Sequence, residues 1–404
     1  MARRYSRRIS PMERLAFAVN EIYHYHVDGV MEGKGDVDPA TLQAAVDRAA
    51  EANPAIRVRL KGRLGFARWV DSGIPPQVRV MPQANWDGNS EEGAPFLKER
   101  LDGMRGGPIA DILIVPCADG LTRIVFRTQH AAIDGRGFMH WCYEVFRAMR
   151  GEPLQGSTST FTDLDVQAQY ADKVPDEPPA EAVSTMSVVA AGPPDGAPLH
   201  YIWRRLVLDR NISQLLPKAA AFIAEYARRR EPGEVAFMIP VDYRGLRTEE
   251  LGLGNLTGYV RLTVPEGARA RNLMVQIHKR IQAYADCRPV PGKNALLWLP
   301  VSLLSRRIST KIEGLLYHLN PVFGTGGLVS MGTVLPESFA FPGFVPKRLH
   351  GIPGAVGKLN IVFLNDNDTS TICFTAPARY NDQGQFDAFV EAFRAHFSQS
   401  GQEG

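Results

Sequence analysis

Apolar residues in the N-terminal part of the chain follow two different periods. Between Asp38 and Asn53 they recur every three or four positions, which predicts an amphipathic helix. Ile56–Leu60 alternates apolar residues with arginines, as a half-buried strand does. Two more strands are predicted at Asp111–Pro116 and Leu121–Thr128, joined by a turn. The same criteria predict two earlier elements, a helix opened by the capping box Ser10–Glu13 and a strand at Tyr23–Met31.

A second amphipathic segment, Phe138–Met149, is predicted to be a helix that ends at Gly151. From Gly151 to about Pro198 the pattern gives way to Gly, Pro, Ser and Thr, which indicates a crossover between two halves. The second half again alternates predicted strands (Tyr201–Leu208, Val235–Val241, Tyr259–Val264, Leu328–Met331, Lys358–Phe363, Ser370–Ala376) with helices (Ile212–Arg229, Ala268–Ala285, Gln385–Phe397). We therefore expect a mixed α/β (α+β) protein with an N-terminal lobe at 1–165, a linker at 166–198 and a C-terminal lobe at 199–404.

The length of 404 residues is too great for one ordinary core and indicates two domains of about 200 residues each. A formal charge of +3 is too small to indicate nucleic-acid binding. No apolar run approaches the roughly 18–20 residues of a membrane span, and Met1–Arg8 lacks the apolar core of a secretory signal. The four cysteines are scattered, as expected for thiols in a reducing cytoplasm: Cys117, Cys142, Cys287 and Cys373. We expect a cytoplasmic protein without nucleic-acid partners.

The hexapeptide H-A-A-I-D-G at 130–135 joins the predicted strand Leu121–Thr128 to the helix that follows. Loops held between rigid elements often carry catalytic residues. A neutral histidine with a pKa near its ordinary value of about 6.5 can remove a proton at neutral pH. Glycine at positions 135 and 137 allows the main chain to approach a ligand closely. His130 is therefore the candidate general base.

This H-x-x-x-D-G motif resembles the His motif of thioester-dependent acyltransferases, which include chloramphenicol acetyltransferase and the condensation domains of nonribosomal peptide synthetases. The order of other motifs is also similar: D-P-x-x-L from Asp38, N-P-x-I-R from Asn53, P-V-D-x-R from Pro240 and G-N-x-x-G from Gly254. The resemblance implies two chloramphenicol-acetyltransferase-like lobes in a V, with an active-site tunnel between them. It also implies a phosphopantetheine thioester, on coenzyme A or an acyl carrier protein, as the donor, with no metal and no permanently bound cofactor.

By the same resemblance, His130, Asp134 and Gly135 are the catalytic motif. Asp134 is expected to turn away from the substrate and pair with an arginine that fixes the loop. Arg244 matches that position, and a solvated loop cation is the alternative. Gly135 would contribute a backbone amide or simple clearance. Residues at positions that the superfamily uses for substrate binding or structural support are Gln129, Arg244, Asn255 and Ser330.

A second match to H-x-x-x-D-G begins at His24, inside the predicted strand Tyr23–Met31. Side chains alternate along a strand, so His24, His26 and Asp28 share one face. These residue types also suit a metal ion. A polar strand face is the preferred interpretation, because the sequence offers no further ligands nearby.

We expect an acyltransferase of the condensation-domain type that acts in secondary metabolism, such as nonribosomal peptide synthesis, on a small-molecule amine or alcohol. Any carrier protein would act in trans. The N-terminal arginines either contact the phosphates of coenzyme A or an acidic carrier protein, or form a solvated tail: Arg3, Arg4, Arg7 and Arg8. Two alternatives stay open, a catalytically silent protein that recruits carrier proteins and an enzyme of the same fold that catalyses cyclisation or hydrolysis.

Overall fold

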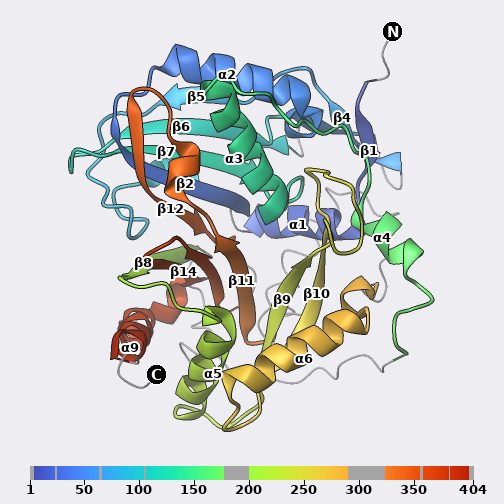
Figure 1. Ribbon diagram of the computed structural model, residues 1–404, viewed down its shortest axis with the longest axis vertical. Helices are drawn as coiled ribbons and strands as arrows, with labels where there is room; N and C mark the ends of the chain where they lie inside the picture. The colour runs from blue at the N-terminus through green and yellow to red at the C-terminus, as the bar shows by residue number, and fades with distance from the viewer. Residues whose placement is uncertain are drawn as a thin grey trace.

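The computed structural model describes residues 4–22, 25–62, 66–103, 106–176, 200–289, 324–354, 358–381 and 383–399. These residues form a mixed α/β structure with two large sheets, as predicted (Figure 1). One sheet has five strands and lies in the N-terminal lobe, and the other has six strands and lies in the C-terminal lobe.

The N-terminal lobe is built on the sheet β12-β2-β7-β6-β5. Its strands are β2 (His26–Gly35), β5 (Gln77–Val80), β6 (Ala110–Pro116), β7 (Thr122–Gln129) and β12 (Phe344–Ile352). Two helices, α2 (Pro39–Ala52) and α3 (Gly135–Met149), cover one face of this sheet (Figure 1). Their apolar stripes form one buried core with the sheet: Leu42, Val46, Phe138, Val145, Ile112 and Phe126. This packing holds the connection between β7 and α3, which carries His130.

A small sheet, β1-β4-β3, lies beside the N-terminal lobe. It comprises β1 (Ser6–Arg8), β3 (Val58–Lys61) and β4 (Arg68–Asp71), and η1 (Pro54–Arg57) leads into β3. Helix α1 (Pro11–Ile22) opens with the predicted capping box, in which the Ser10 amide donates to Glu13 at 2.9 Å and the Glu13 amide donates to the Ser10 hydroxyl at 3.3 Å. The Trp69 indole of β4 also donates to Glu13, at 3.2 Å. The first turn of α1 is thereby fixed to the small sheet.

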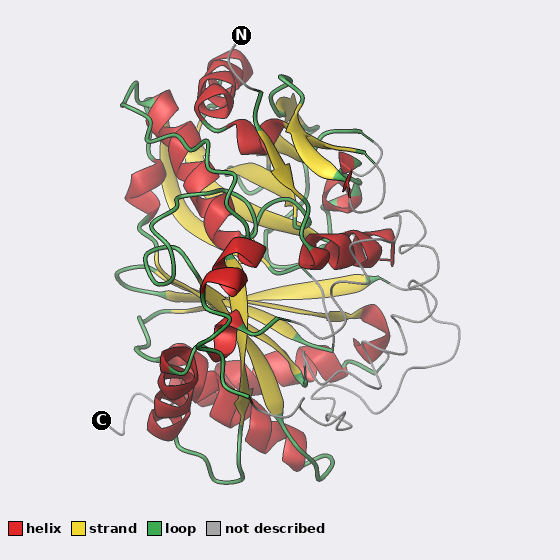
Figure 2. Cartoon of the chain, turned by 90° about the vertical axis from the view of Figure 1, so that its right-hand side faces the viewer, coloured by secondary structure: helices red, strands yellow, loops and turns green. Residues whose placement is uncertain are grey.

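The C-terminal lobe is built on the sheet β10-β9-β11-β13-β14-β8. Its strands are β8 (Tyr201–Leu208), β9 (Ala236–Asp242), β10 (Thr257–Thr263), β11 (Gly326–Thr333), β13 (Asn360–Asn365) and β14 (Ser370–Pro377). Helices α5 (Leu215–Arg228), α6 (Ala270–Gln282) and α9 (Gln385–Gln399) pack on the side of the sheet that faces away from the N-terminal lobe (Figures 1 and 2). Phenylalanines of α9 fill the core beneath the sheet: Phe386, Phe389, Phe393 and Phe397.

Strand β12 shows that the sequence boundary at residue 199 does not separate the lobes completely. It follows β11 of the C-terminal sheet, yet it pairs antiparallel with β2 of the N-terminal sheet, from Phe344 opposite Gly35 to Ile352 opposite Asp28. The periodicity did not predict this strand, because Pro346, Lys347 and Arg348 interrupt its apolar alternation. A segment of the second half therefore completes the first lobe.

Most predicted elements are present, with ends shifted by a few residues. The predicted strand Ile56–Leu60 is divided between η1 and β3. The predicted linker begins within a helix, α4 (Asp163–Gln169), and its residues 177–199 lie outside the described residues. All four cysteines are buried and free, as predicted.

Candidate active site

His130 lies at the first turn after β7, where main-chain hydrogen bonds fix the loop. Its amide donates to the Tyr25 carbonyl at 3.1 Å, and the Ala132 amide donates to the Gln129 carbonyl at 2.9 Å. The imidazole stacks on the Tyr25 ring, with centroids 4.6 Å apart and planes inclined by 15°. His130 is half-buried and lines a cavity between the two lobes. The loop thus holds the ring in one place while leaving it reachable.

Burial is the main influence on the protonation of His130. It lowers the pKa of the imidazole below 6.5, and the nearby negative charge of Asp134 opposes this shift only in part. The ring is therefore neutral at pH 7, which is the form required of a general base.

Asp134 is saturated with hydrogen-bond donors. Its side chain caps α3 by accepting from the Gly137 amide at 2.8 Å. It also accepts from the Leu256 amide at 2.8 Å and the Thr257 hydroxyl at 2.9 Å. Burial would raise the pKa of this carboxyl, but the Arg244 cation and the N–H donors outweigh it and lower the pKa below 3.8. Asp134 is thus a permanently ionised structural anchor and does not exchange protons near neutral pH.

Arg244 provides the cation for Asp134, as the family resemblance implied. Its two terminal nitrogens each lie 3.1 Å from an oxygen of Asp134, in a bidentate pair whose side chains are only 11% and 3% exposed. The guanidinium also donates to Asp242 at 2.8 Å and to the carbonyls of Gly252 and Gly254 at 2.8 and 2.7 Å. Arg244 follows β9 of the C-terminal sheet, so the pair joins the two lobes beside the His130 loop. A solvated loop cation is excluded.

A buried network supports the carbonyl groups of the His130 loop, and the sequence reasoning missed most of it. The Asn255 amide donates to the Ala131 carbonyl at 3.2 Å and to Glu13 at 3.1 Å. Arg7 donates to the Ala132 carbonyl at 2.8 Å and forms an ion pair with Glu13 at 2.7 Å. Arg7 is buried, so neither a phosphate contact nor a solvated tail describes it, whereas Arg4 and Arg8 are exposed. Only the capping box marked Glu13 in the sequence.

The other predicted site residues have different surroundings. Ser330 is exposed on β11 and lines the cavity, and Asn255 also lines it. Gln129 is fully buried, donates to the Leu101 carbonyl at 3.3 Å and is not among the residues that line the cavity. Of the two roles expected for Gln129, structural support fits this position better than substrate binding.

The interlobe cavity has a volume of about 420 Å³ and a mainly apolar wall. Residues from both lobes line it, including Val27, Phe138, Met139, Met331, Leu349 and Val362. Polar residues that interrupt this apolar wall include His130, Asn255, Asp28 and His350. A largely apolar pocket with a few placed polar groups is the usual form of a small-molecule site.

The described part of the second H-x-x-x-D-G match lies on a strand, as predicted, and its polar side chains are buried. His24 lies outside the described residues, while His26 and Asp28 are buried in β2. The described residues contain no group of three or more His, Cys, Asp or Glu arranged to bind a metal ion. Asp28 instead lines the interlobe cavity.

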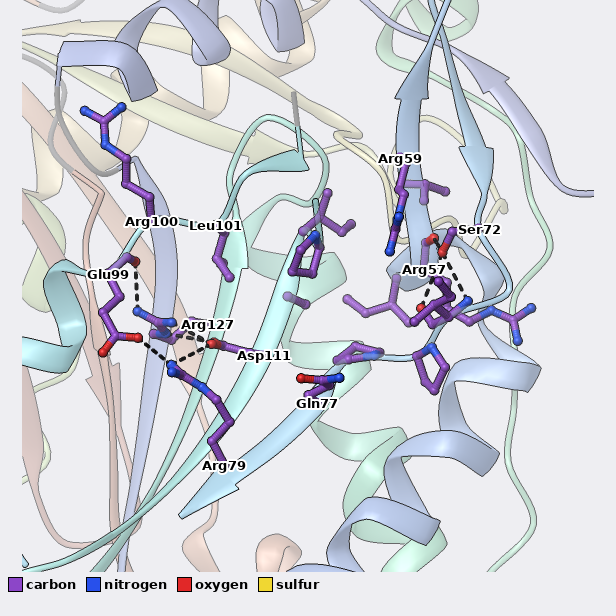
Figure 3. A pocket seen from close by; sticks show the side chains of 18 residues that line it. Arg57, Arg59, Ser72, Gln77, Arg79, Glu99, Arg100, Leu101, Asp111 and Arg127 are labelled. Carbon is purple, nitrogen blue, oxygen red and sulfur yellow. Dashed lines mark hydrogen bonds and ion pairs between the residues drawn. The ribbon is translucent and has the colours of Figure 1, made fainter. Parts of the chain in front are cut away.

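A second cavity, of about 320 Å³, lies at the edge of the five-stranded sheet and is rich in arginine (Figure 3). Its charges are largely paired. Arg79 contacts Glu99 at 2.7 Å and Asp111 at 3.1 Å, and Arg127 is bonded to both oxygens of Asp111. This cavity is separate from the one that contains His130.

Gly137 is required for the contact between α3 and the C-terminal lobe, although the motif points to Gly135. A Cβ atom on Gly137 would overlap the Leu253 carbonyl, whereas one on Gly135 would lie 3.7 Å from the Met331 sulfur, an ordinary contact. We predict that Gly137→Ala lowers the free energy of unfolding by about 1–3 kcal/mol. Gly135→Ala is the matched control and should leave stability nearly unchanged. Urea denaturation measures both, and equal stability of the two variants would contradict the assignment.

Replacing Arg244 tests the ion pair between the lobes. We predict that Arg244→Met destabilises the protein by about 3–5 kcal/mol, because it leaves the buried Asp134 carboxylate without its cation. The exposed pair of Arg229 with Glu225, 73% and 64% accessible, provides the control, and Arg229→Met should change stability little. Chemical denaturation at pH 7 compares the two, and a small effect of Arg244→Met would show that the pair is dispensable.

Comparison with known proteins shows the fold. The sequence matches no protein-family model and no curated protein. Solved structures do match over nearly the whole chain. The first condensation domain of the CDA synthetase has a TM-score of 0.64 at 14% identity, over 98% of this chain and 96% of that one. Polyketide synthase associated protein 5 from Mycobacterium tuberculosis has a TM-score of 0.61 at 15% identity, over 98% and 99%.

The starter condensation domain of rhizomide synthetase, in a mutant form in complex with C8-CoA, has a TM-score of 0.61 at 14% identity, over 96% of this chain and 94% of that one. None of the described helices combines the length and apolar character needed to cross a bilayer. The similarity over almost the full length of each chain establishes that this protein has the condensation-domain fold.

Proposed function

We propose that this protein transfers an acyl group from a phosphopantetheine thioester to an amine or hydroxyl acceptor, with His130 as the general base. The observation that carries this proposal is a neutral, stacked histidine, fixed by its loop, in the wall of a mainly apolar cavity between two lobes. Similar structures include a condensation domain in complex with C8-CoA, which supports a thioester donor of this type.

In the proposed reaction, His130 takes the proton of the acceptor while its nitrogen or oxygen attacks the thioester carbonyl carbon. The tetrahedral intermediate then expels the pantetheine thiolate, which receives the proton from His130. One C–S bond breaks and one C–N or C–O bond forms, so the reaction is complete without an oxidant or reductant. A positioned base contributes about 10²–10⁴-fold to such a rate, and holding both substrates in the cavity contributes much of the remainder.

The N-terminus of α3 offers electrostatic support for the oxyanion of the intermediate. Gly135 is the first residue of this 15-residue helix and lines the cavity beside His130. The first amides of a helix have no acceptor within the helix, and the helix dipole favours negative charge at this end. In this proposal the Gly135 amide faces the developing charge, and Asp134 acts only by positioning the loop.

The donor is either coenzyme A or an acyl carrier protein in trans, and the acceptor is a small molecule. No cofactor stays permanently bound in this scheme. A cytoplasmic setting in secondary metabolism, such as nonribosomal peptide or polyketide synthesis, fits this chemistry. The experiments below distinguish acyl transfer from three alternatives: silent recruitment of a carrier protein, hydrolysis and cyclisation.

We predict that His130→Ala loses at least about a hundredfold in acyl transfer, because it removes the general base. The measurement is mass spectrometry of products from pantetheine thioesters incubated with a panel of amines and alcohols. His278→Ala, an exposed histidine on α6, is the matched control and should behave as wild type.

Equal rates for wild type and His130→Ala would remove His130 from the reaction. Release of free acid without acceptor product would indicate hydrolysis, and an intramolecular product would indicate cyclisation. A carrier protein that binds both forms equally well, with no turnover by either, would indicate recruitment.

The pH dependence of kcat/KM tests the protonation state of His130. We predict that kcat/KM rises with pH and levels off after a midpoint below 6.5, because burial lowers the pKa of the imidazole and the neutral form is the active one. An alcohol acceptor avoids titration of the nucleophile. The profile of Asp28→Asn identifies any contribution from Asp28, whose pKa burial raises to about 7. A midpoint above 6.5 in both proteins would contradict the assignment.

A further inference from the structure

Two buried polar residues in the wall of the interlobe cavity have atoms without hydrogen-bond partners. Asp28 is 9% exposed and His350 is fully buried, and both line the cavity. Among the described residues, Oδ1 of Asp28 and Nε2 of His350 have no partner. Such atoms are costly in a protein interior unless a ligand or water completes them. Their position in a substrate cavity therefore points to a ligand with polar groups.

The strand pairing places these two residues close together on one face. Asp28 of β2 lies opposite Ile352 of β12, and His350 lies opposite Val30. Residues two positions apart along a strand share a face, so Asp28 and His350 are diagonal neighbours with Cα atoms about 7–8 Å apart. Ile352, opposite Asp28, shares this face and also lines the cavity.

The protonation of His350 is fixed by Arg205, which can only donate. Its Nη1 lies 2.9 Å from Nδ1 of His350, so Nδ1 must accept and Nε2 must carry the proton in the neutral ring. Arg205 is itself held by Glu32 at 2.6 Å and Asn89 at 3.0 Å. Burial and the neighbouring arginines keep the pKa of His350 well below 6.5. His350 thus presents one N–H donor.

The arginine opposite Asp28 acts on it through its charge, while its hydrogen bonds go to other groups. Arg127 of β7 lies opposite Asp28, but its guanidinium donates to Asp111 at 2.8 and 2.6 Å (Figure 3). It also donates to the carbonyls of Phe96 and Glu99 at 2.8 and 3.0 Å. Asp28 therefore offers a carboxyl oxygen as an acceptor, next to the donor of His350.

The distance from His130 distinguishes this pair from the reaction centre. In the pairing of β2 with β7, Asp28 lies opposite Arg127, which precedes His130 by three residues. Three residues of strand correspond to about 10 Å. A group bound here is thus not the attacking nucleophile but a second polar group on the same substrate.

We propose that Asp28 and His350 form a polar subsite that selects substrates with a hydroxyl or secondary amide at a distance from the reacting atom. Such a group donates to Asp28 and accepts from His350, and an alkyl chain can do neither. The identity of the bound molecule as a substrate rests on the proposed function. The binding chemistry itself does not.

The test is equilibrium binding, by calorimetry, of pantetheine thioethers, which cannot transfer their chains. The probes carry linear chains of equal length with a methylene, a hydroxyl or a secondary amide at successive positions. Wild type should bind at least one hydroxyl or amide probe about tenfold or more tightly than the methylene probe, because the polar probe completes buried groups. The hydroxyl and amide series distinguish the two kinds of ligand.

Three variants connect this preference to the two residues. Asp28→Leu and His350→Phe should each abolish it, and Asp28→Asn, which can still accept a hydrogen bond, should retain part of it. Asp36→Leu changes an exposed carboxylate just beyond the end of β2 and should keep the wild-type preference. Thermal unfolding of each variant checks that a loss of preference is not a loss of structure, and the partial preference of Asp28→Asn tests the assignment where Asp28→Leu is poorly folded.

Equal binding of all probes by wild type would overturn the subsite, as would a preference that survives both Asp28→Leu and His350→Phe. The result is independent of catalysis. A selective protein that transfers no acyl group would retain the subsite and reject the proposed function, whereas an active protein without selectivity would do the reverse.

Discussion

The bidentate ion pair between Asp134 and Arg244 is the interaction on which the candidate site depends. Asp134 caps the first turn of α3, so it fixes the helix that follows His130, and Arg244 attaches this helix to the end of β9 in the other lobe. Because both side chains are buried and the carboxylate accepts five hydrogen bonds in total, the pair is satisfied. The cavity wall therefore keeps one geometry at the point where the lobes meet.

In the proposed mechanism, proton transfer and positioning belong to different residues of one motif. His130 is held by its loop and by Tyr25, with its pKa lowered by burial, so it is available as a base at neutral pH. Asp134 has a lowered pKa, and its carboxylate already accepts five hydrogen bonds. It is therefore suited to holding the loop in place. Arg7 and Asn255 hold the carbonyls of Ala132 and Ala131, which orients the loop from beneath. We therefore expect a substitution of Arg7 or Asn255 to change the position of the His130 loop and not the protonation of the imidazole itself.

Strand β12 brings residues from both halves of the chain into the wall of one cavity. This strand follows β11 of the C-terminal sheet and pairs with β2, so it places His350 beside Asp28 in a wall that also contains His130. Neither lobe has a complete cavity by itself. The subsite proposed for Asp28 and His350 therefore depends on a strand that the chain delivers from its second half.

The sequence by itself determined the strands and helices with regular periodicity, their caps and the motif around His130, because these depend on residues a few positions apart. Arg244 was indicated as the partner of Asp134 only through the resemblance of its motif to that of known acyltransferases. Only the tertiary structure decided where β12 pairs, that Arg7 is buried, and that Asp28 and His350 meet. Arg7 and the carbonyl that it binds are 125 positions apart, and Arg205 and His350 are 145 apart. Local patterns carry no signal for such contacts, because partners of buried polar groups are chosen by the packing of distant strands.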